Sequence, residues 1–109
     1  MQLKARGANK QLIKRREAEE RAQRQPVAQA FWQRTVEGYQ FDHQSLTLLA
    51  QACYSLARAE QARERLDLEG MTVTDRTGKM QPHSCIKIEL EHRQLFVRIC
   101  KELGFLAVD

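Results

Sequence analysis

The residue types that could hold a metal ion or attack a substrate gather in one stretch of the sequence. His83, Cys85 and His92 lie within ten residues, and both types are common zinc ligands. A closed structural zinc site needs four ligands, usually supplied as Cys-x₂-Cys or His-x₃-His pairs, and neither spacing occurs here. On a helix, His92 falls on an apolar stripe, where a packed histidine is commoner than a metal ligand. We therefore expect no metal and no cofactor.

The sequence does not indicate nucleophilic or acid–base catalysis. A cysteine nucleophile needs a positioned base and a third group that orients this base, and the segments around Cys85 and Cys100 show no such set. The five glycines are isolated, so no Gly-rich phosphate loop is predicted. Carboxylates such as Glu89 and Glu91 stand beside basic residues, which is typical of a solvated helix surface. We expect no catalytic residues and no enzyme activity.

Basic side chains are concentrated at the start of the chain. Residues 1–25 carry eight basic and three acidic groups, a net charge of +5, whereas the rest carries ten basic and eleven acidic groups, a net charge of −1. Phosphate neutralisation with counterion release needs charge density more than a particular spacing. A solvated, solubilising tail is the alternative reading. The predicted DNA-binding residues are Lys4, Arg6, Lys10, Lys14, Arg15, Arg16, Arg21 and Arg24.

Helical periodicity begins after Pro26. Trp32 and Val36 stand four residues apart in a short first helix that we expect to close at Gly38. Asp42 is suited to cap a second helix, because a short carboxylate accepts backbone N–H bonds from the first turn. No proline or glycine follows until after Glu69, which predicts a helix near 27 residues long.

A short β-hairpin is expected between two long helices. Gly70 ends the long helix, and residues 71–81 combine β-branched residues with a turn signal at Asp75-Arg76-Thr77-Gly78. Pro82 is expected to open the last helix, which runs to Leu103. The two long helices should therefore form an antiparallel pair.

Apolar stripes on these helices define the expected core and the contacts between copies. The stripes of the long helix form so broad a face that it must meet more than one neighbour. Another stripe runs along the last helix. The residues predicted to lie in the core or in an oligomer interface are Trp32, Leu49, Cys53, Leu56, Ile88, Leu95, Phe96, Ile99 and Leu103.

The predicted fold is mainly α, with a basic, flexible N-terminal arm at residues 1–26. A helical core and oligomerisation domain at residues 27–109 holds the short first helix and the long helix pair, joined by the hairpin at about residues 71–81. The chain lacks a run of about 18 apolar residues, and its basic start lacks the apolar stretch of a secretory signal. We expect a cytosolic protein with reduced cysteines and no membrane partner.

The order of these parts resembles the small terminase subunits of tailed phages, in the branch found with HK97-like phages. The resemblance covers roughly residues 28–106. The positions that carry it are Phe31, Trp32, Asp42, Leu46, Leu49, Ala52, Cys53, Tyr54, Glu69, Gly70, Gly78, Pro82, Leu95, Glu102, Leu103, Gly104 and Phe105.

The resemblance implies a role in viral genome packaging. Proteins of this family assemble into rings, bind double-stranded DNA at the packaging-initiation region and deliver it to the large terminase subunit, which holds the ATPase and the nuclease. A homo-oligomeric ring of about eight to ten copies in the cytoplasm of the bacterial host is therefore expected, closed by one repeated interface. Repeating the basic arm around a ring would raise its effective concentration at DNA.

Two other functions fit the residues. A small DNA-binding regulator would need a short helix-turn-helix, which the predicted connection of about ten residues between long helices disfavours. A protein-only helical adaptor would use the basic arm as a solubility tail and an apolar face for a partner chain. The adaptor predicts no salt-dependent DNA binding.

Overall fold

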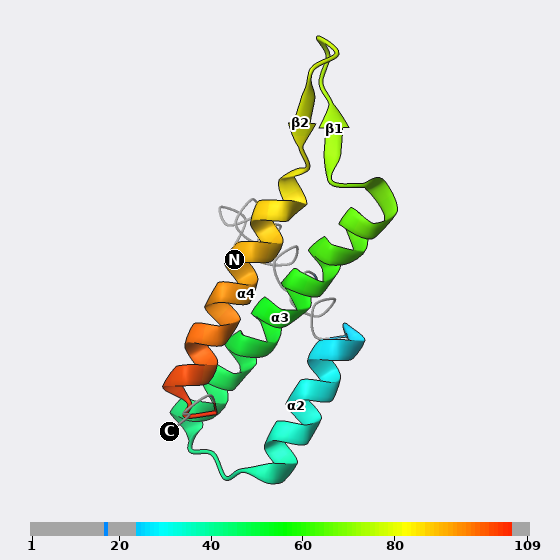
Figure 1. Ribbon diagram of the computed structural model, residues 1–109. Helices are drawn as coiled ribbons and strands as arrows, with labels where there is room; N and C mark the ends of the chain where they lie inside the picture. The colour runs from blue at the N-terminus through cyan, green and yellow to red at the C-terminus, as the bar shows by residue number, and fades with distance from the viewer. Residues whose placement is uncertain (1–16, 18–23, 106–109) are drawn as a thin grey trace, which may run out of the picture.

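The computed structural model describes residue 17 and residues 24–105. This part of the chain forms, in order, α2 (Pro26–Gly38), α3 (His43–Glu69), β1 (Thr72–Thr74), β2 (Met80–Pro82) and α4 (Ser84–Glu102) (Figure 1). The prediction of a mainly helical chain with one small antiparallel hairpin is confirmed. Most of the predicted arm, residues 1–16 and 18–23, lies outside the described residues, as do residues 106–109.

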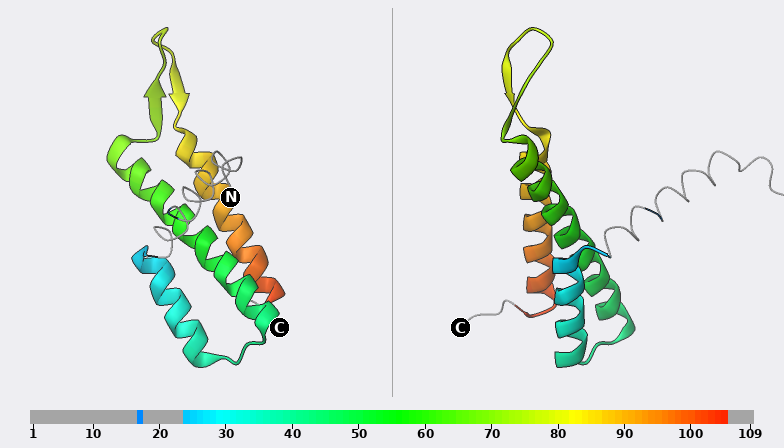
Figure 2. Two further views of the ribbon diagram at one scale, coloured as in Figure 1. Left: turned by 180° about the vertical axis from the view of Figure 1, so that it is seen from behind. Right: turned by 90° about the vertical axis from the view of Figure 1, so that its right-hand side faces the viewer.

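The longest helix, α3, organises the packing. It runs antiparallel to α4, as predicted, and α2 lies along its N-terminal half (Figures 1 and 2). Small residues allow this close approach: Ala28 of α2 packs against Ala57 of α3, and both are buried. Tyr54 packs against this pair. The broad apolar face of α3 therefore meets two neighbours, as its stripes predict.

Helix α2 begins with a side-chain cap. The Gln25 side chain accepts a hydrogen bond of 2.9 Å from the backbone N–H of Ala28, and Pro26 occupies the first turn, where its missing N–H costs nothing. The sequence predicts an arm that extends to Pro26, whereas this proline is the first residue of α2. The helix ends at Gly38, as expected, and the backbone is extended at Tyr39.

The predicted limits of α3 are confirmed at both ends. Asp42 is the N-cap, and its Oδ1 accepts a 2.7 Å bond from the Ser45 N–H, which lowers the pKa of the Asp42 carboxyl. At the other end, Gly70 takes φ +86°, a conformation that favours glycine, and donates its N–H to the Leu66 carbonyl at 2.8 Å. The 27 residues between these caps form one uninterrupted helix.

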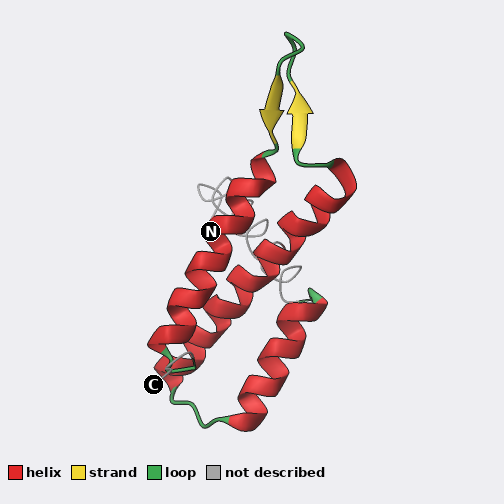
Figure 3. Ribbon diagram, in the orientation of Figure 1, coloured by secondary structure: helices red, strands yellow, loops and turns green. Residues whose placement is uncertain are grey.

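The hairpin projects beyond the ends of α3 and α4 (Figure 3). Thr72 pairs with Pro82 and Thr74 with Met80, and every residue from Gly70 to Pro82 is exposed. The prediction that Pro82 opens the last helix is wrong, because this proline ends β2. Proline is tolerated at the end of an edge strand, where no ladder N–H is required of it.

Helix α4 begins at Ser84, two residues after the predicted start at Pro82. His83 is the N-cap residue, and its Nδ1 accepts a 3.0 Å hydrogen bond from the Cys85 N–H. The helix ends at Glu102, with Leu103 as the C-cap and Gly104 at φ +87°. The sequence placed the end at Leu103, one residue further, which is within the usual variation of helix ends.

Candidate functional site

Of the eight predicted DNA-binding residues, the structure describes Arg24. It is exposed and lies just before the Gln25 cap of α2. The remaining predictions fall outside the described residues, namely Lys4, Arg6, Lys10, Lys14, Arg15, Arg16 and Arg21. Arg24, the last basic residue of this segment, thus stands two residues before the first residue of α2.

The predicted core and interface residues divide into three groups. Leu49, Cys53, Leu56 and Ile99 are buried in the chain itself. A second group is partly buried and consists of Trp32, Phe96 and Leu103. A third group is exposed in the single chain: Ile88 by 41% and Leu95 by 37%. Ile88 and Leu95 are therefore not part of the core of the single chain. Of the two predicted roles, core and oligomer interface, the interface stays a prediction for them.

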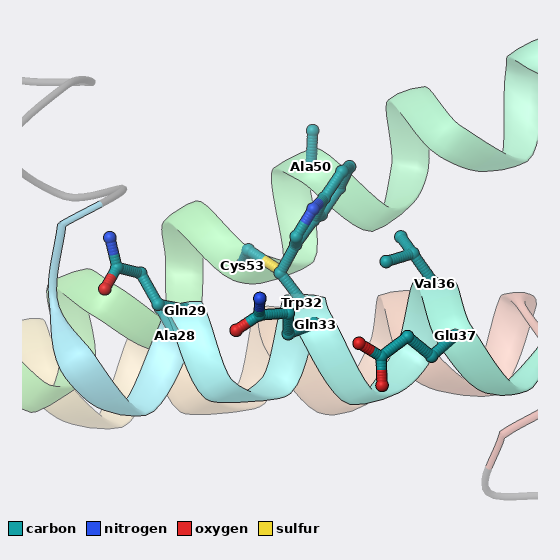
Figure 4. A pocket seen from close by; sticks show the side chains of 8 residues that line it. All are labelled: Ala28, Gln29, Trp32, Gln33, Val36, Glu37, Ala50 and Cys53. Carbon is teal, nitrogen blue, oxygen red and sulfur yellow. The ribbon is translucent and has the colours of Figure 1, made fainter.

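An open groove runs between α2 and α3 (Figure 4). It has a volume of about 890 Å³, and we call it the α2–α3 groove. Its apolar side chains include Trp32 and Val36 from α2 and Ala50 and Cys53 from α3. The polar side chains that line it are Gln29, Gln33 and Glu37, all on α2. The groove thus combines an apolar floor with a single charged group, which is acidic.

Burial makes the thiol in this groove a poor nucleophile. Desolvation raises the pKa of Cys53 to about 12, and the neighbouring Cys100 thiol adds to the effect. Burial also raises the pKa of Cys100. Both thiols therefore stay protonated near neutral pH and contribute as small apolar side chains.

A second apolar surface lies on α4, away from the side chains that pack on α3. Ile86, Leu90 and Val97 are 39%, 56% and 39% exposed. Their spacing of four and seven residues places them on one side of a helix, and we call them the α4 stripe. The lysines nearest in sequence to the ends of the stripe are Lys87 and Lys101, both exposed. This surface is apolar, with the acidic residues Glu89 and Glu91 beside Leu90 in the sequence and one lysine toward each end.

Aromatic rings join the ends of α2 and α4. The Phe105 ring lies 4.9 Å from that of Tyr39 and 6.1 Å from that of Phe41, measured between centroids. Phe31 contacts Phe96 at 5.1 Å in an edge-to-face arrangement, the geometry that aromatic quadrupoles favour. The Phe31–Phe96 contact joins the two helices further along their length, and the Phe105–Tyr39 contact places the C-terminal ends of α2 and α4 at the same end of the molecule.

A histidine joins the hairpin to both long helices at the opposite end. His83 is buried, and its Nε2 lies 2.8 Å from Oε1 of Glu69, at the end of α3. Because Nδ1 accepts from Cys85, the neutral ring carries its proton on Nε2 and donates to Glu69. The His83 backbone N–H also bonds the Met71 carbonyl at 2.8 Å. One residue thus fixes the start of α4, the end of α3 and the base of the hairpin.

An ion-pair cluster holds α4 against α3 at mid-length. Arg93 lies 2.6 Å from Glu60 of α3 and 2.9 Å from Glu89 of α4, and all three side chains are partly buried. Desolvation by burial lowers the pKa of the Arg93 guanidinium, but the hydrogen bonds and the charges of Glu60 and Glu89 together outweigh it, so this pKa is raised. The cluster sets the relative position of the two helices.

His83, Cys85 and His92, the candidate zinc ligands of the sequence, are engaged separately. The His83 ring is hydrogen-bonded to Glu69 beside the hairpin. The centroid of the His92 ring lies 6.4 Å from that of Tyr54, and burial lowers the pKa of His92. Within residue 17 and residues 24–105, no three histidine, cysteine or acidic side chains gather to bind a metal ion.

Comparison with family models, curated proteins and solved structures finds no match to the chain. The resemblance to small terminases therefore rests on this chain's own residues. In the described part of the chain, no helix is both long enough and apolar enough to cross a membrane.

The sequence did not reveal the contacts that join distant residues. Glu69 and His83 are 14 residues apart, and Glu60 and Arg93 are 33 apart, so no local pattern relates them. The α2–α3 groove was missed for the same reason. Trp32 and Val36 were recognised as one helical face, but the sequence does not say which part of α3 that face meets.

Proposed function

We propose that this protein is the small terminase subunit of a tailed phage or phage-like element. In this role it forms a ring, binds viral DNA at the packaging-initiation region and recruits the large terminase subunit. The observation that carries the proposal is the succession of parts along the chain: a basic segment, aromatic-bearing α2, capped α3, a hairpin and α4. The small terminase family is similar in this succession.

The distribution of charge supports a DNA-binding role for the basic segment. Residues 1–25 carry a net charge of +5, while the rest of the chain is nearly neutral at −1. A helical body of this kind gives DNA no strong attraction of its own, whereas a dense basic segment gains binding free energy by releasing counterions from phosphates. The segment leads directly into α2, so each copy would present one arm.

The surface of the helical body supports assembly of several copies. A ring needs two different surfaces on each subunit that fit each other and repeat by rotation. The α2–α3 groove and the exposed apolar residues of α4 are two such surfaces. In a ring, many weak arms act on one DNA molecule, so that modest affinity per arm suffices.

The proposed DNA contact predicts a specific loss on mutation of the arm. Replacing Arg15, Arg16 and Arg21 together with alanine should weaken DNA binding. It should also flatten the salt dependence, because each phosphate contact contributes about 0.9 to the slope of the logarithm of the binding constant against the logarithm of the salt concentration. Binding would be measured by fluorescence anisotropy at several salt concentrations, and assembly by light scattering, which should be unchanged.

A matched control removes the same charge from the helical body. Arg63, Arg76 and Arg98 are exposed, and their replacement by alanine should leave most of the affinity and the salt slope in place. Equal losses in both triple variants would contradict a dedicated arm. Unchanged binding in the Arg15, Arg16 and Arg21 variant would refute the DNA-binding part of the proposal.

A further inference from the structure

We infer that the hairpins of neighbouring copies pair edge to edge, so that β2 of one copy joins β1 of the next and the hairpins close into one continuous sheet. The inference rests on the proposed function, since it names a contact within the proposed ring. Three features of the hairpin carry it, namely its backbone hydrogen-bonding groups, its side chains and its charges. All three match in one and the same register.

The backbone groups at the base of the hairpin include some that point away from it. The His83 N–H donates to the Met71 carbonyl at 2.8 Å, so these two residues form a hydrogen-bonded pair. Hydrogen-bonded and non-hydrogen-bonded pairs alternate along an antiparallel ladder. The next pair, Thr72 with Pro82, is therefore non-hydrogen-bonded, and its backbone groups face outward.

The same pattern holds toward the turn. The Asp75 N–H donates to the Lys79 carbonyl at 2.9 Å, so the pair before it, Thr74 with Met80, is again non-hydrogen-bonded. Thr74 thus presents its N–H and C=O on the free edge of β1, and Met80 presents its own on the free edge of β2. The whole hairpin is exposed and stands clear of the helices (Figure 3). Unpaired groups on a strand edge are a template for pairing with another chain.

Rotation about an axis along the strands brings the two edges together. Copies related by rotation point the same way along the axis, so β2 of one copy faces β1 of the next, and these strands run antiparallel. Residues keep their level, so Met80 meets Thr74 of the next copy and both pairs of outward N–H and C=O groups bond. Pro82 meets Thr72 in the same way. Its carbonyl accepts from the Thr72 N–H, while proline has no N–H to return.

The side chains and the charges match in this same register. Val73 of one copy lies opposite Gln81 of the next, so no like charges meet there. Val73 and Met80 are 43% and 67% exposed in the single chain, and both gain a neighbour in the continuous sheet. One residue before Met80, Lys79 stands opposite Asp75 of the next copy, which places a base beside an acid.

The width of the hairpin suits the expected number of copies. Strands in a sheet lie about 4.8 Å apart, so each hairpin takes about 10 Å of the circumference. A ring of about eight to ten copies then has about 16 to 20 strands, the size at which a closed sheet leaves a water-filled channel. Two helices side by side take about 16 to 20 Å, so the ring should be narrower at its hairpin end.

Amide hydrogen exchange in the assembled protein tests the pairing directly. The outward amides of Thr72, Thr74 and Met80 bond no carbonyl of their own hairpin, whereas the inward amides of Val73 and Gln81 do. In the ring, the outward amides should exchange about tenfold more slowly than in protein diluted to the single chain. The inward amides report whether the hairpin is formed in each state. Equal exchange of the outward amides in both states, in a protein that assembles, refutes the contact.

A proline substitution tests the same edge through the mass of the assembly. Thr74→Pro removes an outward N–H but none of the hairpin's own bonds, and it should raise the protein concentration at which half of the protein is assembled by about tenfold. Thr74→Val keeps the N–H and should assemble like the wild type. Exchange of the inward amides, those of Val73 and Gln81, checks that the hairpin survives each substitution.

The outcomes separate this contact from the ring itself. If Thr74→Pro assembles like Thr74→Val with its hairpin intact, the contact is refuted. If the proline breaks the hairpin, amide exchange in the wild-type protein decides alone. A wild-type protein that stays monomeric refutes the proposed ring and this contact with it, whereas a ring whose outward amides exchange fast refutes this contact alone.

Discussion

Burial distinguishes Cys85 from the other two cysteines. Cys53 and Cys100 are buried against the helix pair, and burial raises the pKa of both thiols, to about 12 for Cys53. Cys85, in the first turn of α4, is only partly buried. Thiol reactivity depends on access and on the thiolate form, so the cysteines should differ in their chemistry although the sequence presents them alike.

Alkylation of the folded protein should therefore be selective. With iodoacetamide at pH 8, Cys85 should be modified first, and Cys53 and Cys100 should react only after unfolding. Peptide mass spectrometry would measure the three rates, with the urea-unfolded chain as the control in which all three react. Modification of Cys53 in the folded protein at the rate of Cys85 would contradict the packing of α2 and α4 on α3.

Asp75 gives the hairpin turn a defined response to acid. Its Oδ1 accepts bonds from the Thr77 hydroxyl at 2.6 Å and from the Lys79 N–H at 3.0 Å. These bonds, with the Thr77 hydroxyl contributing most, lower the pKa of the carboxyl from 3.8 to about 2. A carboxyl with a lower pKa in the folded state stabilises that state above its unfolded pKa and loses this effect as the pH falls through the folded value.

The hairpin turn should thus loosen between about pH 4 and pH 2, within the range set by these two values. NMR titration of the Asp75 carboxyl carbon would follow the transition, and Asp75→Asn should abolish this pH dependence. A carboxyl that titrates near 3.8 in the folded protein would show that the turn bonds are not formed.

At the scale of the elements, the junction at His83 determines where the hairpin points. Its ring bonds the end of α3 and the start of α4, and its backbone N–H bonds the base of β1. The residues from Gly70 to Pro82 are all exposed, so the hairpin buries little surface against the helices. A two-stranded hairpin is marginal alone, so its order should depend on this residue.

Two variants separate the bonds of His83. His83→Asn keeps a short acceptor suited to an N-cap but cannot reach Glu69, and Glu69→Ala removes the acceptor of the Nε2–H. Both should speed amide hydrogen exchange at the hairpin base while leaving the middle of α3 and α4 protected. Asp67→Ala, an exposed neighbouring acid, serves as the control. Uniformly faster exchange in all helices, or unchanged exchange at the base, would contradict a local junction.

The sequence predicted elements best where caps and stops are local. Asp42 and Gly70 bound α3 as expected, since a cap acts within one helical turn. The prediction for Pro82 was wrong because proline suits both the first turn of a helix and the end of an edge strand. In the structure Pro82 pairs with Thr72 and so belongs to the strand. The groove and the ion pair between Glu60 and Arg93 depend on which helix faces meet, and periodicity describes each helix alone.

At the scale of the whole molecule, the chain combines a nearly neutral helical body with a basic segment. The body has a small core rich in alanine, and several large apolar side chains remain exposed, among them Leu90 at 56% and Leu68 at 84%. A single chain of this kind leaves apolar area to be buried by association. Assembly and DNA binding should therefore be linked, because the affinity of one arm is raised by its neighbours in the ring.

The mass of the purified protein in solution tests this account most directly. Native mass spectrometry or light scattering, with and without DNA at low and moderate salt, would give the number of copies. We expect a uniform closed assembly of about eight to ten copies, which gains the mass of bound DNA at low salt and loses it as salt rises. A monomer or dimer at every protein concentration, with or without DNA, would contradict the proposed small terminase function.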